Sequence, residues 1–253
     1  SSYKMAVKYK PENLVYLYHL SELDDEVLNL DLKNKIYEII ESSNTNKKNI
    51  AYGNFLLSRY EQKDKKYKDE FNHLLKGHKY YFESEDKKFK KEVEYSLNVL
   101  PKIKELINLN RYNKKISKES YVIKPIFIIG VPRCGSTLIE KVIASGSQYI
   151  PIGEETSIID TALANLINHK QSINLDIKNF QTKIIEAYKQ KGLVEKKNDY
   201  MFTDKSLENF LYIDIIKAIF PNAKVINCRR NTLSSIMSTL KNNLVLLSWT
   251  HNL

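Results

Sequence analysis

The chain has 253 residues, enough for one large domain or two smaller ones. Apolar residues make up 42% of it, which is sufficient for a folded core, and 40 Lys and Arg against 30 Asp and Glu give a formal charge of +10. A basic surface attracts anions such as nucleotides and acidic peptides. We expect most of the lysines to lie on solvated faces, and we expect no nucleic-acid partner.

Two cysteines, Cys134 and Cys228, are too few for a disulfide framework. We interpret them as free, reduced thiols, and a bridge between them is the alternative. No apolar run approaches the roughly 18 residues of a membrane span, and no signal peptide is visible. We therefore expect a cytoplasmic protein without a membrane span. The sequence starts with Ser-Ser and stops soon after Trp249, so we expect a fragment.

Residues 1–120 have the apolar spacing of helices. Apolar side chains recur there every three or four positions, as on the buried face of a helix. The first two series are Leu14, Leu17 and Tyr18, then Ile36, Ile39 and Ile40. A helix pair with a turn at Lys63–Lys66 follows. Its expected buried faces are Tyr52, Phe55, Leu56 and Tyr60, then Tyr67, Phe71, Leu74, Leu75 and His78.

This helix pair is similar to a degenerate tetratricopeptide repeat. Leu57, Tyr67 and Phe71 match apolar positions of that repeat, whereas Ser58 and Glu70 stand where small residues are usual. The alternative is a helical hairpin of another kind. The pattern predicts an α-helical, repeat-like region at the start of the chain.

A further helix is predicted from Asp86 to Asn108. Pro101 lies within it, and proline lacks a backbone N–H and crowds the preceding turn, so we expect a kink or a break there. The expected buried face consists of Phe89, Val93, Leu97, Leu100, Ile103 and Ile107.

From Tyr121 onward, strand patterns alternate with helix patterns. Residues 122–129 form a β-branched, nearly uncharged run before Gly130, which is typical of a central parallel strand, and Lys224–Cys228 is a second strand. The expected helices are Leu138–Ser145, Ser157–Asn168, Ile177–Lys191, Leu207–Phe220 and Leu233–Asn243. The alternation predicts an α/β fold with a parallel sheet flanked by helices. We divide the chain into a helical region, 1–120, and an α/β domain, 121–253, that we expect to be truncated at its C-terminus.

The loop after the first strand has the pattern of a phosphate cradle, in which backbone N–H groups and a helix N-terminus meet one anion. Gly130 and Gly135 have the spacing of G-x-x-x-x-G-K-[ST], but Ser136 replaces the lysine that a nucleoside-triphosphate loop needs. Arg133 instead offers a fork of donors for a phosphate or sulfate. The loop predicts an anion site, and sulfuryl transfer is one function that fits it.

Four segments resemble the sulfotransferase superfamily. Val131–Leu138 resembles its 5′-phosphosulfate loop, and Gly153–Thr156 resembles the G-E-E-T of tyrosylprotein sulfotransferases. Phe202–Phe210 is similar to the D-K-x-P-x-N-F of bacterial tetratricopeptide-containing sulfotransferases, and Phe220–Arg230 is similar to their L/F-P-N-A-K-I-I-x-C-R-R. These motifs follow the family's order, cover residues 121–253, and imply a P-loop-like sheet.

The resemblance implies 3′-phosphoadenosine 5′-phosphosulfate as the sulfate donor. Arg133, with the backbone of Cys134, Gly135, Ser136 and Thr137, would hold the 5′-phosphosulfate. The family usually has serine at the position of Cys134, and we interpret this cysteine as a spectator. The resemblance implies catalysis without a metal.

The resemblance also assigns Arg230 and Ser238 to the 3′-phosphate of the donor, and we interpret Arg229 as a neighbouring ion-pair residue instead. Arg230 follows the second predicted strand, and ligands of open α/β sheets bind where the strands end. Asn231 and Thr232 replace the family's usual Asp-Pro, which leaves the local turn open.

Three residues are implied to act on the acceptor and the leaving group. Glu155 would be the general base that takes the proton of an acceptor hydroxyl, and Glu154 is its rival. Both acids could instead stabilise the N-terminus of the helix that follows. Lys205 would neutralise charge on the oxygen that leaves sulfur. Like Arg133, these three residues are candidate catalytic residues.

The expected function is transfer of a sulfuryl group to a hydroxyl of a small molecule, a sugar, or a peptide or protein, with peptide tyrosine as one candidate. A P-loop NTPase or kinase is one alternative, but the second strand ends in Cys228-Arg229-Arg230 and not in an acid that would hold Mg²⁺. A non-catalytic repeat scaffold is the other. The histidines, including His169 and His251, lack the spacing of metal ligands, so we assign no metal.

Overall fold

The computed structural model describes residues 2–102, 104–105, 122–146, 149–168, 177–194, 201–245 and 247–252, apart from the side chains of 166–168 and 177. It forms two compact units: unit 1 is Ser1–Glu94 with Ile236–Leu253, and unit 2 is Tyr95–Ser235. Each unit has its own hydrophobic core. The domain boundary predicted between residues 120 and 121 lies outside the described residues and stays a prediction.

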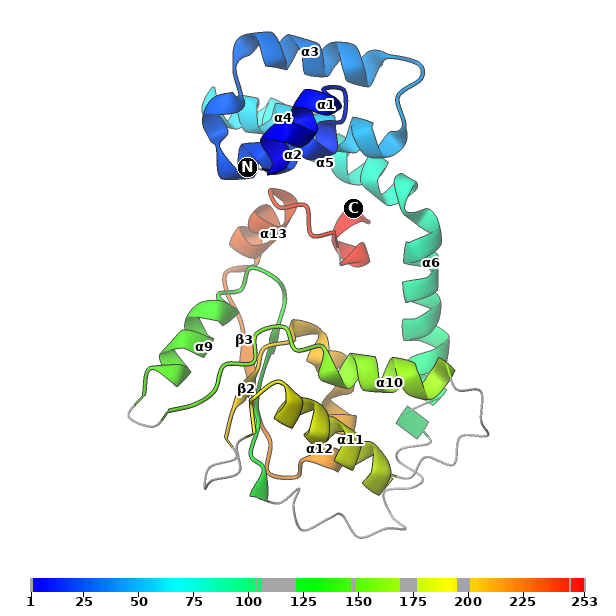
Figure 1. Cartoon of the computed structure of the whole chain (residues 1–253), viewed down its shortest axis with the longest axis vertical. Coiled ribbons are helices and arrows are strands. Elements are labelled where there is room, and N and C mark those ends of the chain that lie inside the picture. The colour runs from blue at the N-terminus through cyan, green and yellow to red at the C-terminus, as the bar shows by residue number, and fades with distance from the viewer. Residues whose placement is uncertain are drawn as a thin grey trace. The chain divides into compact units, whose positions relative to one another are not determined.

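Unit 1 is helical, as the apolar spacing predicted (Figure 1). Its elements are α1 Ser2–Tyr9, α2 Leu14–Leu23, η1 Asp25–Val27, α3 Leu30–Glu41, α4 Lys47–Lys63, α5 Tyr67–Ser84, α6 Asp86–Glu94 and η4 Ser248–His251. Asparagines begin three of the helices: the side chains of Asn13, Asn29 and Asn46 each accept a hydrogen bond from a backbone N–H of the first turn. Such N-caps satisfy donors that a helix start leaves without partners.

The hairpin of α4 and α5 is present, but the predicted buried face of α5 is partly wrong. Tyr67 is 65% exposed, and Phe71 and Leu75 are exposed too. The buried face contains Glu70, Leu74, Gly77, His78 and Tyr81. Gly77 explains why the buried face of α5 differs from the predicted one. A Cβ atom at this position would lie 2.7 Å from the ring of Phe55 on α4. The two helices therefore approach each other at Gly77 and not at Tyr67 and Phe71.

The predicted helix Asp86–Asn108 departs from α geometry just before Pro101. Residues Tyr95–Val99 form a π-helical turn, and helix continues at 100–102. A π turn is a common way for a helix to accommodate a local disruption. Phe89 and Leu100 are buried as predicted, Val93 and Leu97 are exposed, and Ile103 and Ile107 lie outside the described residues.

Unit 2 contains a three-stranded parallel sheet in the order β2-β1-β3. The strands are β1 Ile126–Gly130, β2 Thr203–Asp204 and β3 Lys224–Cys228, and the helical elements are α9 Ser136–Ala144, α10 Ile158–Asn168, α11 Ile177–Gln190, η3 Leu207–Tyr212, α12 Ile213–Ile219 and the start of α13 Thr232–Leu240. Figure 1 shows α9 on one side of the strands and α10, α11 and α12 on the other. The predicted α/β class, with a parallel sheet flanked by helices and preceded by a helical region, is confirmed.

The strand predicted at 122–129 is shorter and begins at Ile126. Pro125 precedes it and has no N–H to donate, although its carbonyl accepts a hydrogen bond from Lys224 N. The strand predicted at Lys224–Cys228 is confirmed. Each helix predicted in this half has a helical counterpart, but Leu207–Phe220 begins as the 3₁₀ turn η3.

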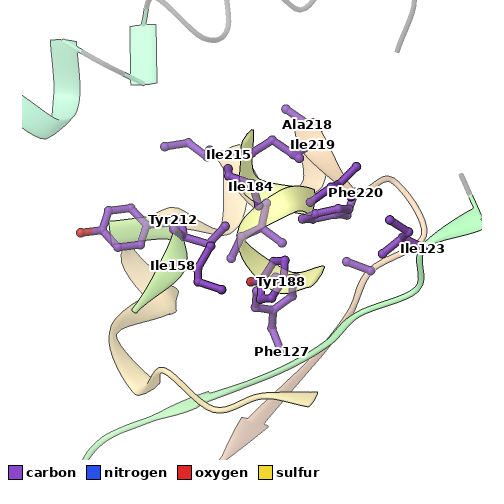
Figure 2. Close-up of a cluster of buried hydrophobic side chains, with 14 of the residues drawn as sticks. Ile123, Phe127, Ile158, Ile184, Tyr188, Tyr212, Ile215, Ala218, Ile219 and Phe220 are labelled. Atoms are coloured by element: carbon purple, nitrogen blue, oxygen red, sulfur yellow. The ribbon is translucent and has the colours of Figure 1, made fainter. Parts of the chain in front are cut away.

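Alternation along β1 separates the two faces of the sheet. Phe127 points into the large core of unit 2, where Tyr188 of α11, Tyr212 and Phe220 also lie (Figure 2). The next residue, Ile128, packs with the two cysteines in a small cluster. The large core packs β1 against α10, α11 and α12, and so holds the strand and these helices together.

Candidate active site

All three strands of unit 2 end at one edge of the sheet, because they are parallel. The loop with Arg133 follows β1, Lys205 follows β2, and Arg230 comes soon after β3. Ligands of open α/β sheets bind at this edge. The fold therefore brings together, on one edge, three basic residues that are far apart in the sequence.

The loop between β1 and α9 depends on two glycines. Gly130 has φ +152°, and a Cβ atom there would lie 2.6 Å from the carbonyl oxygen of Cys228 on β3. Gly135 has φ +93°. A positive φ is uncommon for residues with a side chain. The strand exit and the helix entry are thus both shaped by glycine.

The loop delivers a helix N-terminus and an arginine to the sheet edge. Gly135 stands at the N-cap of α9 and has no side chain, so the first-turn N–H groups of Ser136 and Thr137 receive no hydrogen bond from the N-cap. Arg133 is exposed and has φ +67°. Its carbonyl accepts a long hydrogen bond from Nη1 of Arg230, at 3.5 Å. This is an arrangement that can bind an anion.

Residues 151–154 run alongside β2 and place an acidic residue beside it. Thr203 N donates to Pro151 O at 3.0 Å, and Lys205 N donates to Gly153 O at 2.9 Å. A Cβ atom at Gly153 would lie 2.2 Å from Thr203 O, so the close approach requires glycine. The parallel bridge between Glu154 and Lys205 continues this pairing.

Glu154 and Lys205 form an ion pair at the sheet edge. Lys205 Nζ lies 2.8 Å from Glu154 Oε1, and the side chains are 3% and 55% exposed. The hydrogen bond and the positive charge of Lys205 lower the pKa of the Glu154 carboxyl. Glu154 is thus ionised at neutral pH, and its lysine partner is almost completely enclosed.

Glu155 differs from its neighbour. It is exposed, has φ +46°, and within the described part of the chain its carboxylate has no hydrogen-bond or ion-pair partner. Ser157 also has a positive φ, +51°. Non-glycine residues in this region cost free energy and are concentrated at functional sites.

Asp204, to which the sequence motifs gave no role, directly precedes the lysine of the ion pair. It is completely buried. Its carboxylate accepts hydrogen bonds from Thr156, Tyr188, Asn209 and the backbone of the residue after Lys205. Asp204 belongs to the two-residue strand β2, which is too short for a periodic pattern, so the sequence held no local signal of its burial.

Glu140 of α9 is a second acid that the sequence did not single out. It is buried, and its Oε1 accepts a hydrogen bond from Thr203 Oγ1 at 2.7 Å. The same hydroxyl accepts a hydrogen bond from Gly153 N at 3.1 Å. Burial raises the pKa of the Glu140 carboxyl, and the negative charges of Glu154 and Asp204 act in the same direction.

Both cysteines are free and buried. Cys134 and Cys228 pack with Ile128 on the face of β1 opposite the large core. Burial raises the pKa of the Cys228 thiol, and the neighbouring Cys134 adds to this. The pair thus has an apolar packing role below the loop.

The remaining predicted residues have varied positions. Ser238 belongs to unit 1 and Arg230 to unit 2, so their pairing stays a prediction. Asn231 accepts a hydrogen bond from Ser234 N at 3.0 Å and so begins α13 without the family's proline. His251 lies in unit 1, buried against His78, and burial lowers its pKa to about 4. His169 lies outside the described residues.

Comparison with known proteins identifies the family. A family model described as "Sulfotransferase family" matches residues 125–252, about half of the chain. The chain belongs to the sulfotransferase family. The match begins just before β1 and includes every residue placed at the sheet edge above. The expected membership of the superfamily is therefore confirmed, and it implies a transferase.

One relative of this sulfotransferase chain is an uncharacterized protein of Aquifex aeolicus (strain VF5), 32% identical over 133 residues. The alignment covers 47% of this chain and 17% of that protein. The chain thus spans less than a fifth of that relative's length. None of the solved structures matches the chain.

For this sulfotransferase chain we expected neither a metal site nor a membrane span. Within the described ranges, no group of three or more His, Cys, Asp or Glu side chains is arranged to hold a metal ion. Among the helices of those same ranges, none is sufficiently long and apolar to cross a membrane. The predicted compartment stays a prediction.

Proposed function

We propose that the protein transfers a sulfuryl group from 3′-phosphoadenosine 5′-phosphosulfate to an acceptor hydroxyl. The observation that carries the proposal is the sheet edge of unit 2. It combines the uncapped N-terminus of α9 and Arg133 with the Lys205–Glu154 pair, within the segment that matches the sulfotransferase family. The chain covers a small part of its Aquifex relative, so the activity of the whole protein is part of this proposal.

In this proposal, the β1–α9 loop is a P-loop-like cradle for the 5′-phosphosulfate. The N–H groups from Cys134 to Thr137 surround the anion, and the Arg133 guanidinium donates to its oxygens. Arg230 and Ser238 hold the 3′-phosphate. The long hydrogen bond from Arg230 to Arg133 O supports a common position for the two arginines.

The chemical step uses the acidic loop and the lysine. The acceptor hydroxyl gives its proton to Glu155 as its oxygen attacks sulfur. The bond from sulfur to the 5′-phosphate oxygen breaks, its electron pair stays on that oxygen, and the Lys205 ammonium neutralises the charge. The geometry favours Glu155 as the base over Glu154, because Glu154 is already bound to Lys205.

A cavity among the described residues of unit 2 is a candidate for the acceptor side. A cavity of about 670 Å³ between α10 and α11 reaches Thr156, which follows Glu155. Its apolar lining includes Ile158 and Ala162, and Lys183 and Lys191 supply positive charge without a carboxylate among the described lining residues. We propose that it accepts a hydroxyl compound with an apolar body and acidic neighbours, such as a tyrosine in an acidic peptide.

Unit 1 has a separate role in this proposal. We propose that α4 and α5 are a tetratricopeptide-like hairpin that binds a protein or peptide partner. Leu57 is buried, as its counterpart in such a repeat would be, but Tyr67 and Phe71 are exposed. The exposed aromatic side chains are therefore free to contact a partner.

Transfer of labelled sulfur tests the chemical proposal. The chain is mixed with the ³⁵S-labelled donor and tyrosine peptides whose flanking residues are either acidic or basic. We expect labelling of the acidic peptide, a loss of roughly 100-fold or more in Glu155→Gln, and a smaller loss in Glu154→Gln. Equal losses in the two variants would reject Glu155 as the base. In a parallel reaction, transfer of the γ-phosphoryl group from ³²P-labelled ATP to the peptide would support the kinase alternative.

A further inference from the structure

We propose that Asp204, together with Tyr188, is a positioning residue that holds Lys205 and the acidic loop 153–157 against each other. This proposal rests on the proposed function only in the claim that the geometry serves sulfuryl transfer. The geometric part stands on the side-chain contacts of unit 2. Asp204 itself is buried too deeply to touch a substrate, so it acts through its neighbours.

Each oxygen of the Asp204 carboxylate accepts two hydrogen bonds. Oδ2 accepts from Thr156 Oγ1 at 2.7 Å and from Tyr188 Oη at 2.5 Å. Oδ1 accepts from Ser206 N at 3.0 Å and from Asn209 Nδ2 at 3.2 Å. The donors belong to the acidic loop, to α11, and to the residues on the C-terminal side of Lys205. One carboxylate therefore joins three separate segments around the ion pair.

Burial makes this arrangement costly unless every acceptor is satisfied. A buried carboxylate loses its hydration, and an apolar side chain of similar size is often at least as stable in such a position. Burial also raises the pKa of the Tyr188 hydroxyl, so Tyr188 stays protonated and donates to Asp204. General stability is thus a poor explanation for Asp204, whereas fixed geometry is a good one.

The acidic loop shows what is being held. Glu155 and Ser157, on either side of Thr156, both have positive φ. Such backbone persists only where surrounding contacts hold it in place. Thr156 is held by Asp204, and Ser157 N donates to Ser206 Oγ at 3.0 Å. Consecutive residues of the strained loop are therefore attached to Asp204 and Ser206, the residues on either side of Lys205.

A pair of tyrosine variants separates positioning from stability. Tyr188 donates to Asp204, and Tyr212 donates in the same way to Asp160, at 2.6 Å. Both tyrosines belong to the large core, with Tyr212 at one side of it (Figure 2). Tyr188→Phe and Tyr212→Phe each remove one hydrogen bond from a buried tyrosine to a carboxylate without changing net charge, although Asp160 itself is exposed. Only the first removes a bond to the proposed positioning residue.

The readout is the titration of the Glu154 carboxyl by ¹³C NMR in the whole 253-residue chain. Glu154→Gln assigns the signal, and Lys205→Met gives the midpoint when the ion pair is absent. The hydrogen bond and the charge of Lys205 lower the pKa of Glu154, with Lys141 as a weaker cause, so a loosened pair raises the midpoint. We expect Tyr188→Phe to move the midpoint toward that of Lys205→Met, and Tyr212→Phe to leave it unchanged.

A second pair keeps the test decisive if Tyr188→Phe does not fold. Thr156→Val removes the hydroxyl bound to Asp204, Thr156→Ser restores it, and Thr182→Val removes a hydroxyl bonded only within α11. We expect a raised midpoint in Thr156→Val alone. An unchanged midpoint in Tyr188→Phe or Thr156→Val, or an equal shift in the matched controls, would overturn the proposal. The titration needs no nucleotide, so it stands even if the donor does not bind.

Discussion

At the scale of single residues, Lys205 is the centre of the candidate site. Its ammonium group bonds to Glu154, and its positive charge partly offsets the rise in the pKa of Glu140 that burial causes. The nearly buried ammonium thus contacts Glu154 and acts electrostatically on Glu140. In the proposed function, an ammonium group at this position stabilises the leaving phosphate oxygen.

Glu140→Gln tests this balance through stability. Burial raises the pKa of Glu140, so its ionisation opposes folding above that raised pKa and has no effect below the ordinary glutamate pKa. Glutamine keeps the acceptor for Thr203 Oγ1 without the charge. We expect the variant to be more stable by about 1 kcal/mol at pH 8, with the gain vanishing as the pH falls to 4. Urea unfolding at both pH values measures this, and a gain independent of pH would contradict it.

The sequence predicted some of these residues and not others, for a physical reason. Arg133, Lys205 and Glu154 lie in motifs whose residue types suit an anion and a leaving oxygen. Asp204 and Glu140 are acids whose burial depends on partners far away in the chain, such as Tyr188 and Thr203. No local pattern announces such a partner, so burial of these acids became visible only in the fold.

At the scale of elements, the two glycines of the β1–α9 loop make different demands. At Gly130, an added Cβ atom would meet the backbone of β3, whereas at Gly135 it would meet nothing within 4 Å. Both have positive φ. Gly130 is therefore required by the packing of two strands, and Gly135 only by its own backbone conformation.

Alanine substitution distinguishes these demands. We expect Gly130→Ala to lose about 3 kcal/mol of unfolding free energy or more, because strain adds to a backbone clash. Gly135→Ala should lose about 1 kcal/mol, from backbone strain alone. Urea unfolding of the two variants gives the comparison. Equal losses would show that the close approach of β1 to β3 is not what requires glycine.

Elements were easiest to predict where the apolar pattern was long. Lys224–Cys228 and the helices followed from periodicity. The strand Thr203–Asp204 was missed because two residues have no period. The buried face of α5 was misplaced because Gly77, and not the aromatic residues, lies against α4. Close backbone approach leaves little trace in a hydrophobic pattern.

At the scale of the molecule, the family match and the division into units complement each other. Residues 125–252 match the sulfotransferase family, and they extend from unit 2 into the C-terminal part of unit 1. The donor proposal uses both parts, because Arg230 lies in unit 2 and Ser238 in unit 1.

Calorimetric titration with 3′-phosphoadenosine 5′-phosphate, the product of the donor, tests the central claim most directly. We expect binding without Mg²⁺, weakened about tenfold or more by Arg133→Ala and by Arg230→Ala, because each removes charged hydrogen bonds to phosphate. The exposed neighbour Arg229→Ala is the matched control and should bind like the unaltered chain. Absence of binding, or affinity that is the same in the Arg133→Ala, Arg230→Ala and unaltered chains, would contradict a phosphosulfate site at this sheet edge.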